Sequence, residues 1–474
     1  MSKKPNVLFI MVDQQRYDCI GFSQEYPVRT PNIDDLAKNG IWFMNAYTNI
    51  PLCTPARSAL INGRRPETFG TLWNHDLGSA IKPLEPREYS WPRELRKLGY
   101  NNAYLGKWHV HPQYNPKAYG YEHYVSLNEY TKFREKKYPE RKLSDGIRID
   151  EEEKLTKWHG EIDPIPLEDS RTHWLSRKAS EMLEKLSRKA DPWHIRIDFS
   201  EPHLPYNPNG KFAGMYSPEN IPAWGGFAEE FINKPYIQKQ QLYNWQVENF
   251  EWKDWAKIVA KYYAVISQVD HAIGQILNTL ERLKLEEDTI VIFTSDHGDL
   301  CGSHRMMDKH FVMYEDVVKV PLILKWSGKI RGNSTCSEFV YNLLDLPPTI
   351  LELLDMTIPD FFQGRSLVPF LKGEILPDWR QEIVATYHGQ QFGLFTQRMY
   401  RTHAWKYIWN PTSIDELYDL REDPFELTNE IYNTKHKDRL KEFRRRLFSI
   451  LLEEGDPFIN NNWMRDQLLN SHKL

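Results

Sequence analysis

Four short apolar runs in this chain each lead directly into acidic, basic or imidazole side chains. The runs span residues 7–12, 102–105, 194–199 and 289–294, and most are rich in β-branched residues. Such runs are typical of strands that are buried on both faces of a parallel sheet. In open α/β sheets, ligands bind beyond the carboxyl ends of the strands. We therefore expect one shared cleft for the polar residues that follow the runs: Asp13, Gln14, Lys107, His109, His203, Asp296 and His297.

Helical patterns separate the runs. Residues 91–99 have Pro92 near the start and Gly99 at the end, as expected for the two ends of a helix. Residues 256–285 carry apolar side chains at three-to-four spacing, which indicates one buried face of a long helix. The stretch 129–169 is charged and weakly periodic, and we expect a surface insertion there. Alternating strands and helices predict an α/β fold with a large mixed, mainly parallel sheet flanked by helices.

The character of the chain changes after Gly364. Residues 382–386, 398–401 and 405–409 have the pattern of short antiparallel strands, and residues 437–454 form a closing helical pattern. We therefore predict an N-terminal catalytic domain over residues 1–365. A smaller C-terminal α+β subdomain over residues 366–474 would hold a small antiparallel sheet and the closing helix.

The overall charge of the chain is balanced. It has 474 residues, with 61 basic and 65 acidic side chains. This balance gives no bulk field for nucleic acid or an anionic membrane, so we expect neither as a partner. The apolar run near the N-terminus is too short for a secretion signal, and no later stretch is long enough to span a bilayer. We expect a soluble, cytoplasmic protein. The alternative that stays open is a secreted protein whose signal peptide has been removed.

The chain has four widely spaced cysteines, and none of them forms a CxxC pair. A zinc ribbon or a thioredoxin-like motif is therefore not expected. Cys53 stands out because residues 53–57 read Cys-Thr-Pro-Ala-Arg. Pro55 suits the first turn of a helix, so the side chain at position 53 would face the positive end of that helix. Arg57, one turn further on, would add a charge-assisted contact. A buried cysteine at a helix start is the simpler alternative.

Cys-x-Pro-x-Arg is the signature of type I sulfatases, and the chain resembles this family along its whole length. The resemblance implies the alkaline-phosphatase-like fold, hydrolysis of sulfate esters, and oxidation of Cys53 to formylglycine by a maturation enzyme. The matching segments occur in the family's order: residues 5–14, residues 53–57 with Gly63-Arg64, residues 106–109, Pro202-His203-x-Pro205, residues 295–298 with Gly302, His304 and Asp308-Lys309, and residues 416–424.

Two of these segments form the expected metal site. Asp13, Gln14, Asp296 and His297, with one oxygen of the modified Cys53, suit a divalent cation, and the resemblance implies Ca²⁺. The oxygen ligands also favour Mg²⁺, and His297 is compatible with Mn²⁺. Many relatives have an acid where Gln14 stands or an asparagine where His297 stands. These departures lower the negative charge of the site and leave the metal open.

The resemblance also implies roles for the remaining residues. The hydrated aldehyde at position 53 offers one hydroxyl to attack sulfur and a second to expel sulfate, while Arg57 and the metal hold the hydroxyl as an oxyanion. Lys107 and Lys309 would neutralise sulfate oxygens. His109 would take the proton that triggers sulfate release, and His203 with Lys309 would protonate the leaving alcohol.

Several alternatives remain open at this point. The nearest is a phosphomonoester, phosphodiester or phosphonate monoester hydrolase of the same superfamily. A cysteine hydrolase that uses Cys53 directly and a non-catalytic binding protein are more distant. As substrate we favour a small sulfated carbohydrate over an aryl or choline sulfate. The expected partners are this saccharide and a formylglycine-generating enzyme, and an oligomer is compatible with the sequence.

Overall fold

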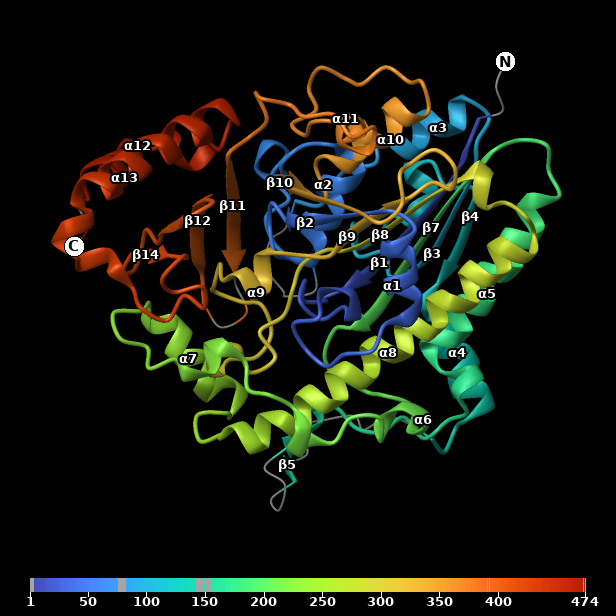
Figure 1. Ribbon diagram of the computed structural model, residues 1–474, viewed down its shortest axis with the longest axis horizontal. Helices are drawn as coiled ribbons and strands as arrows, with labels where there is room; N and C mark the ends of the chain where they lie inside the picture. Colours follow the sequence, from blue (N-terminus) through green and yellow to red (C-terminus); the bar gives the residue numbers. More distant parts are fainter. Residues whose placement is uncertain are drawn as a thin grey trace.

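A single eight-stranded sheet forms the centre of the N-terminal region (Figure 1). The computed structural model describes residues 4–75, 82–141, 149–150, 155–389, 391, 393–471 and 473. In spatial order the strands are β10 (Ser334–Tyr341), β2 (Ile41–Tyr47), β9 (Leu322–Lys325), β8 (Thr289–Ser295), β1 (Asn6–Asp13), β7 (Trp193–Pro202), β3 (Asn101–Gly106) and β4 (His123–Ser126).

The four apolar runs of the sequence form four neighbouring strands. β1 pairs in parallel with both β7 and β8, with Val7 opposite His194 on one side and Ile290 on the other. β3 continues the parallel arrangement beyond β7. Only β9 runs antiparallel to its neighbours β2 and β8 among the described strands of this sheet, which makes it mixed. The predicted fold class is therefore confirmed, and the carboxyl ends of the four strands lie at one edge.

Both faces of the sheet are buried because side chains of β1 alternate between two cores. Leu8 and Ile10 pack in a cluster with the apolar faces of α1, α5 and α8. Val7 and Phe9 belong to the cluster that includes α2, α3 and α10 on the opposite face. This two-sided burial explains why the strand is an uninterrupted apolar run. Figure 1 shows α5 and α8 side by side along one face of the sheet.

The helices differ widely in length, and α8 is the long helix predicted from the three-to-four pattern. They are α1 (Pro31–Lys38), α2 (Cys53–Asn62), α3 (Trp91–Lys97), α4 (Leu127–Lys137), α5 (Arg171–Ser187), α6 (Gly210–Ala213), α7 (Tyr236–Trp245), α8 (Trp252–Arg282), α9 (Glu315–Val318), α10 (Leu346–Leu353), α11 (Val368–Leu371), α12 (Lys437–Glu453) and α13 (Asn462–Asn470). Within the part of the chain that the structure describes, no helix has the length and hydrophobicity that crossing a bilayer requires.

The C-terminal part contains a second, antiparallel sheet. Its order is β11 (Glu382–Gly389), β12 (Phe395–Thr402), β13 (Trp405–Trp409) and β14 (Glu416–Asp419). α12 and α13 pack on this sheet through their apolar side chains. The three predicted strands and the closing helix are all present. The exact boundary at residue 365 stays a prediction.

The segment expected to be a surface insertion has a defined structure of its own. It begins with α4, whose start is stabilised by a capping box between Ser126 and Glu129. A two-stranded hairpin of β5 (Ile149–Asp150) and β6 (Leu155–Thr156) follows. Residues 142–148 and 151–154 of the expected insertion lie outside the described residues. Weak periodicity hid α4 because it is mostly exposed, with Tyr130 its buried side chain.

Candidate active site

The predicted site residues meet at the carboxyl edge of the large sheet. Asp13 is the last residue of β1, and Asp296 follows β8 directly. Lys107 follows β3, and His203 follows β7. Because β8, β1, β7 and β3 are neighbours in the sheet, side chains separated by hundreds of residues come together. The side chains therefore meet at one edge of the sheet, where Lys107 and His203 line a pocket.

Cys53 lies close to these strand ends but belongs to a helix. It is the first residue of α2, follows the extended residue Leu52, and is buried. Its Sγ atom lies 3.2 Å from Nε2 of His297 and 3.9 Å from Oδ1 of Asp13. In an oxidised residue, the hydroxyl oxygens would lie where this sulfur lies. One free N–H of the helix start is already used, because Thr54 donates to the side chain of Asn74 at 2.9 Å.

Four buried side chains form a cluster that suits a single cation. One ligand atom from each of Asp13, Cys53, Asp296 and His297 lies within 4.8 Å of the others. Burial raises the pKa of Asp296, and the charge of Asp13 raises it further. Burial lowers the pKa of His297, but Asp296 and Cys53 outweigh it and raise this pKa to about 9. The carboxylates of Asp13 and Asp296 repel each other, and together with Cys53 they favour the protonated form of His297. A divalent cation bound between them would reduce this repulsion.

Gln14 lies beside this cluster but has other partners in the structure. Its side-chain amide donates to Asp308 at 3.0 Å, and its Oε1 accepts a hydrogen bond from Lys309 at 2.8 Å. Its backbone N–H donates to Asp296 at 3.2 Å. The bond to Asp308 fixes which end of the amide faces Lys309. Metal ligation by Gln14 therefore stays a prediction.

Arg57 is surrounded by three carboxylates. Its Nη2 lies 2.7 Å from Asp13 and 3.0 Å from Asp296, and its Nη1 lies 2.6 Å from Asp198. Nη1 also donates to the carbonyl of Lys107 at 3.1 Å. The side chains of Arg57 and its three carboxylate partners are all fully buried. The guanidinium therefore holds these carboxylates in place, and the predicted contact with a hydroxyl at position 53 stays a prediction.

Two lysines bring positive charge close to Cys53. Lys107 Nζ lies 2.6 Å from Asp13 and 4.0 Å from Cys53 Sγ. Lys309 Nζ lies 3.1 Å from Nε2 of His203. Burial raises the pKa of the Cys53 thiol, but Lys107, Lys309 and His297 outweigh it and hold this pKa well below its usual range. An anion at this position is thus favoured electrostatically.

His109 approaches from the loop after β3 in a left-handed backbone conformation, with φ of 46°. A hydrogen bond from His109 also helps to lower the pKa of the Cys53 thiol. Its ring packs edge-on against His75, with 4.5 Å between the ring centroids. The hydrogen bond places His109 beside the Cys53 thiol, and its role in proton transfer stays a prediction.

Three residues of the site had no assigned role in the sequence interpretation. Asp198 accepts hydrogen bonds from Arg57, from Arg196 and from the hydroxyl of Tyr104. An acid in the middle of an apolar run was the available signal, because a buried charge must be paired. Asp308 contacts Lys309 at 3.1 Å and His310 at 3.2 Å. His310 in turn lies 2.9 Å from the hydroxyl of Tyr387 on β11.

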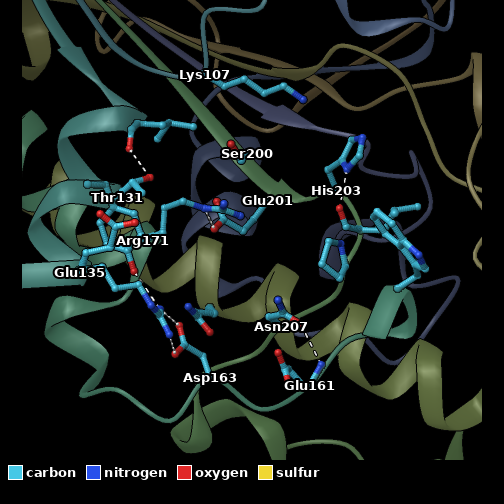
Figure 2. Close-up of a pocket in the computed structure, with 17 residues that line it drawn as sticks. Lys107, Thr131, Glu135, Glu161, Asp163, Arg171, Ser200, Glu201, His203 and Asn207 are labelled. Atoms are coloured by element: carbon cyan, nitrogen blue, oxygen red, sulfur yellow. Dashed lines mark hydrogen bonds and ion pairs between the residues drawn. The ribbon is translucent and has the colours of Figure 1, made fainter. Parts of the chain in front are cut away.

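A pocket of about 560 Å³ opens beside these groups. Lys107 and His203 line it together with α4, the start of α5 and the segment after β7 (Figure 2). A buried cysteine with lysines, histidines and a cluster that suits a cation, next to an open pocket, is the arrangement expected of a hydrolase for esters of a tetrahedral oxyanion.

Comparison with known proteins identifies the family. The family model for sulfatases matches residues 5–356. A model described as N-sulphoglucosamine sulphohydrolase, C-terminal, matches residues 302–452. The chain belongs to the sulfatase family and is a sulfuric ester hydrolase, as the resemblance implied.

The chain is similar to relatives over almost its whole length. It is 29% identical to the arylsulfatase of Clostridium perfringens over 502 residues, covering 97% of each chain. It is 25% identical to the N-acetylglucosamine-6-O-sulfatase of Bacteroides thetaiotaomicron, covering 97% of this chain and 88% of the relative. The solved phosphonate monoester hydrolase of Agrobacterium radiobacter shares the fold, with a TM-score of 0.81, 23% identity and coverage of 95% and 96%.

Proposed function

We propose that this sulfatase hydrolyses the sulfate ester of a small carbohydrate, using formylglycine made from Cys53 and a bound divalent cation. The observation that carries the proposal is the position of Cys53 Sγ, 3.2 Å from His297 and 3.9 Å from Asp13. An unrelated buried cysteine has no reason to lie inside a cluster of two acids, a histidine and two lysines. A formylglycine-generating enzyme is the partner that this proposal requires.

The protein side chains divide the reaction between them. When present, formylglycine would add water to its aldehyde and so supply two hydroxyls on one carbon, one to attack sulfur and one whose proton is removed when sulfate leaves. Lys107 and Lys309 bind sulfate oxygens and offset the negative charge that develops there. His203 with Lys309 gives a proton to the leaving alcohol, and His109 takes the proton from the second hydroxyl.

The cation cluster sets the charge at the nucleophile. Asp13, Asp296 and His297 would hold the ion, and Gln14 is the proposed additional ligand. The ion would supply positive charge that favours an ionised hydroxyl at position 53. Ca²⁺ is our first choice because carboxylate and amide oxygens are its preferred ligands, with Mg²⁺ and Mn²⁺ as alternatives. Arg57 keeps Asp13 and Asp296 in position in this scheme.

The carbohydrate assignment has two supports. The first is that one relative is an N-acetylglucosamine-6-O-sulfatase, a sulfatase named for a sugar. The pocket beside Lys107 and His203 is lined by a mixture of acids, arginines and amides, which suits a hydroxyl-rich ligand better than a bare aryl ring. The phosphonate hydrolase alternative rests on fold similarity alone.

The test is to produce the protein together with a formylglycine-generating enzyme. Mass spectrometry of the peptide that contains Cys53 should show conversion of the thiol-bearing carbon to an aldehyde. Hydrolysis of monosaccharide sulfates should be faster than hydrolysis of a phenyl phosphonate monoester.

Cys53→Ala and Cys53→Ser should both lower the rate to below about 10⁻³ of wild type, because alanine has no hydroxyl and serine has only one. Cys336→Ser, on β10 and outside the site, is the matched control. Full activity of unmodified Cys53 protein would refute the proposal.

A further inference from the structure

Most of the pocket beside Cys53 is lined by side chains that the reaction does not use. Lys107 and His203 connect it to the reacting centre. Figure 2 shows Arg171 and Glu201 next to each other, with Lys107 and His203 on one side of them and Asp163 on the other. A pocket of about 560 Å³ is within the range of about 300–1,000 Å³ that holds small ligands.

Arg171 has donors to spare in this pocket. It is the first residue of α5, and its Nε donates to Oε1 of Glu201 at 2.7 Å. Among the described residues, its Nη1 and Nη2 have no protein acceptor, and 40% of the side chain is exposed. A guanidinium presents its donors in a rigid planar fork. Because Glu201 fixes Nε, the other two nitrogens are available side by side for a ligand.

Arg134 differs because both of its terminal nitrogens already have protein acceptors. Its Nη1 and Nη2 lie 2.8 Å and 2.9 Å from the two carboxylate oxygens of Asp163. These nitrogens also contact the hydroxyl of Tyr130 and the carbonyl of Arg141. This pair ties α4 to the segment before α5 and so forms a fixed wall. Arg171 is therefore the arginine of the pocket that has nitrogens available to donate hydrogen bonds to a ligand.

The charges around Arg171 disfavour a second anion. Apart from Lys107 and His203, the lining has two arginines, Arg134 and Arg171, against four acids: Glu135, Glu161, Asp163 and Glu201. The Oε2 atom of Glu201 is buried and accepts no hydrogen bond from the described residues. A hydrogen bond from a ligand hydroxyl to this buried carboxylate oxygen would be favourable. A hydroxyl can accept from Arg171 and donate to an acid, whereas a carboxylate or sulfate can only accept.

We propose that Arg171, positioned by Glu201, binds two adjacent hydroxyls of an uncharged sugar ring whose single sulfate ester is held at Lys107 and Lys309. The inference rests on the proposed function and adds to it a residue that determines specificity. It selects a neutral sugar against a uronate, against a sugar with a second sulfate, and against an aryl group without hydroxyls.

The test compares kcat/KM of wild type and Arg171→Ala on galactose 6-sulfate, glucuronate 2-sulfate and 4-nitrophenyl sulfate. Loss of a charge-assisted donor pair should lower kcat/KM on the neutral sugar by about 10- to 100-fold. This loss should exceed the loss on 4-nitrophenyl sulfate by at least about tenfold. Arg171→Lys, which keeps the charge but not the fork, should fall between wild type and Arg171→Ala. Arg188→Ala, at the exposed end of α5, is the matched control and should change neither rate.

Glu201→Gln tests the positioning role separately. It keeps the shape of the side chain but loses the charge that fixes Arg171. We expect KM for galactose 6-sulfate to rise by about three- to tenfold, with little change in kcat. A general folding defect would lower kcat on every substrate instead.

The outcomes separate this inference from the proposed function. Wild type that hydrolyses 4-nitrophenyl sulfate but no neutral sugar sulfate would overturn the inference and leave the sulfatase intact. Equal losses on all substrates in Arg171→Ala, or a larger loss on the uronate than on the neutral sugar, would also overturn it. Wild type, with Cys53 converted, that hydrolyses no sulfate ester would refute both.

Discussion

Nε2 of His203 lies 3.1 Å from Nζ of Lys309, and Nδ1 of the same ring lies 2.7 Å from the carbonyl oxygen of Leu204. A carbonyl only accepts, so Nδ1 carries a proton and Nε2 of the neutral ring faces the ammonium group of Lys309. The imidazole and the ammonium therefore form one proton-donating unit. This arrangement makes the need for His203 depend on the leaving group.

The first prediction is that His203→Ala slows substrates with poor leaving groups most. A sugar alcohol must be protonated as it leaves, whereas 4-nitrophenolate is stable without a proton. We expect kcat on a sugar sulfate to fall by about 10²–10⁴-fold, and kcat on 4-nitrophenyl sulfate to fall much less. Rates on a series of phenyl sulfates with increasing phenol pKa would show a steeper dependence in the variant. The same loss across the series would exclude proton donation by this unit.

The second prediction concerns the cation cluster. Adding Ca²⁺ to metal-free protein should raise the melting temperature by a few degrees, because binding to the folded state alone adds stability. Chelation should lower activity about tenfold or more. Asp296→Asn should remove the thermal shift, since it takes away a buried charged ligand, and Asp35→Asn, at an exposed position of α1, should keep it. A melting temperature indifferent to Ca²⁺, Mg²⁺ and Mn²⁺ would argue against a metal at this position.

The third prediction uses a pair of glycines that share a backbone conformation but differ in surroundings. Gly106 has φ of 103°, and a Cβ there would lie 2.0 Å from the backbone oxygen of Asp198. Gly99 has φ of 88°, and its Cβ would meet nothing within 4 Å. Gly99→Ala should cost only the left-handed conformation, about 1 kcal/mol. Gly106→Ala should cost about 2–4 kcal/mol and displace Lys107.

Urea unfolding of both glycine variants, with kcat on one substrate, measures these effects. Activity should fall in Gly106→Ala because the backbone N–H of Lys107 donates to the same oxygen of Asp198 at 2.9 Å. Equal destabilisation of the two variants would show that the close approach of β3 and β7 does not matter.

The fourth prediction is a pH dependence of stability far from the site. Asp270 on α8 accepts hydrogen bonds from the backbone N–H groups of Asn32 and Ile33 at the start of α1. Burial raises the pKa of Asp270 from 3.8 to about 6. The stabilisation of the folded state by the protonated Asp270 carboxyl is thus fully present below pH 3.8. It is lost as the pH rises through about 6, which lowers the free energy of unfolding by about 3 kcal/mol.

Unfolding free energies of wild type and Asp270→Asn at several pH values would measure this contribution. The stability of wild type relative to Asp270→Asn should be greater at pH 4.5 than at pH 7.5. Asparagine does not titrate, so a difference that does not change with pH would contradict the raised pKa.

Much of the centre could be predicted from local pattern. The apolar run at residues 7–12 predicted β1 because burial on both faces leaves no polar position in such a strand. The Pro55 position predicted the start of α2, and parallel strands with polar ends predicted one common edge. These inferences depend on neighbours in sequence or on a general property of parallel sheets.

The rest depends on pairings that no local pattern contains. The contact of Arg57 with an oxyanion at position 53 stays a prediction, and no local pattern indicates that its guanidinium binds Asp13, Asp198 and Asp296. Its choice of partners follows from the order of strands in the sheet. Similarly, the pocket wall of α4 was hidden because an exposed helix that closes a cavity carries little apolar periodicity.

The groups around Cys53 come from the ends of β1, β3 and β8, whereas the outer wall of the pocket comes from α4 and the start of α5. If the proposed roles hold, bond cleavage and the choice of substrate are encoded in different stretches of the gene. Mutations in the pocket wall would then change the substrate specificity while leaving the groups around Cys53 unchanged. An enzyme built this way can acquire a new substrate without first becoming inactive.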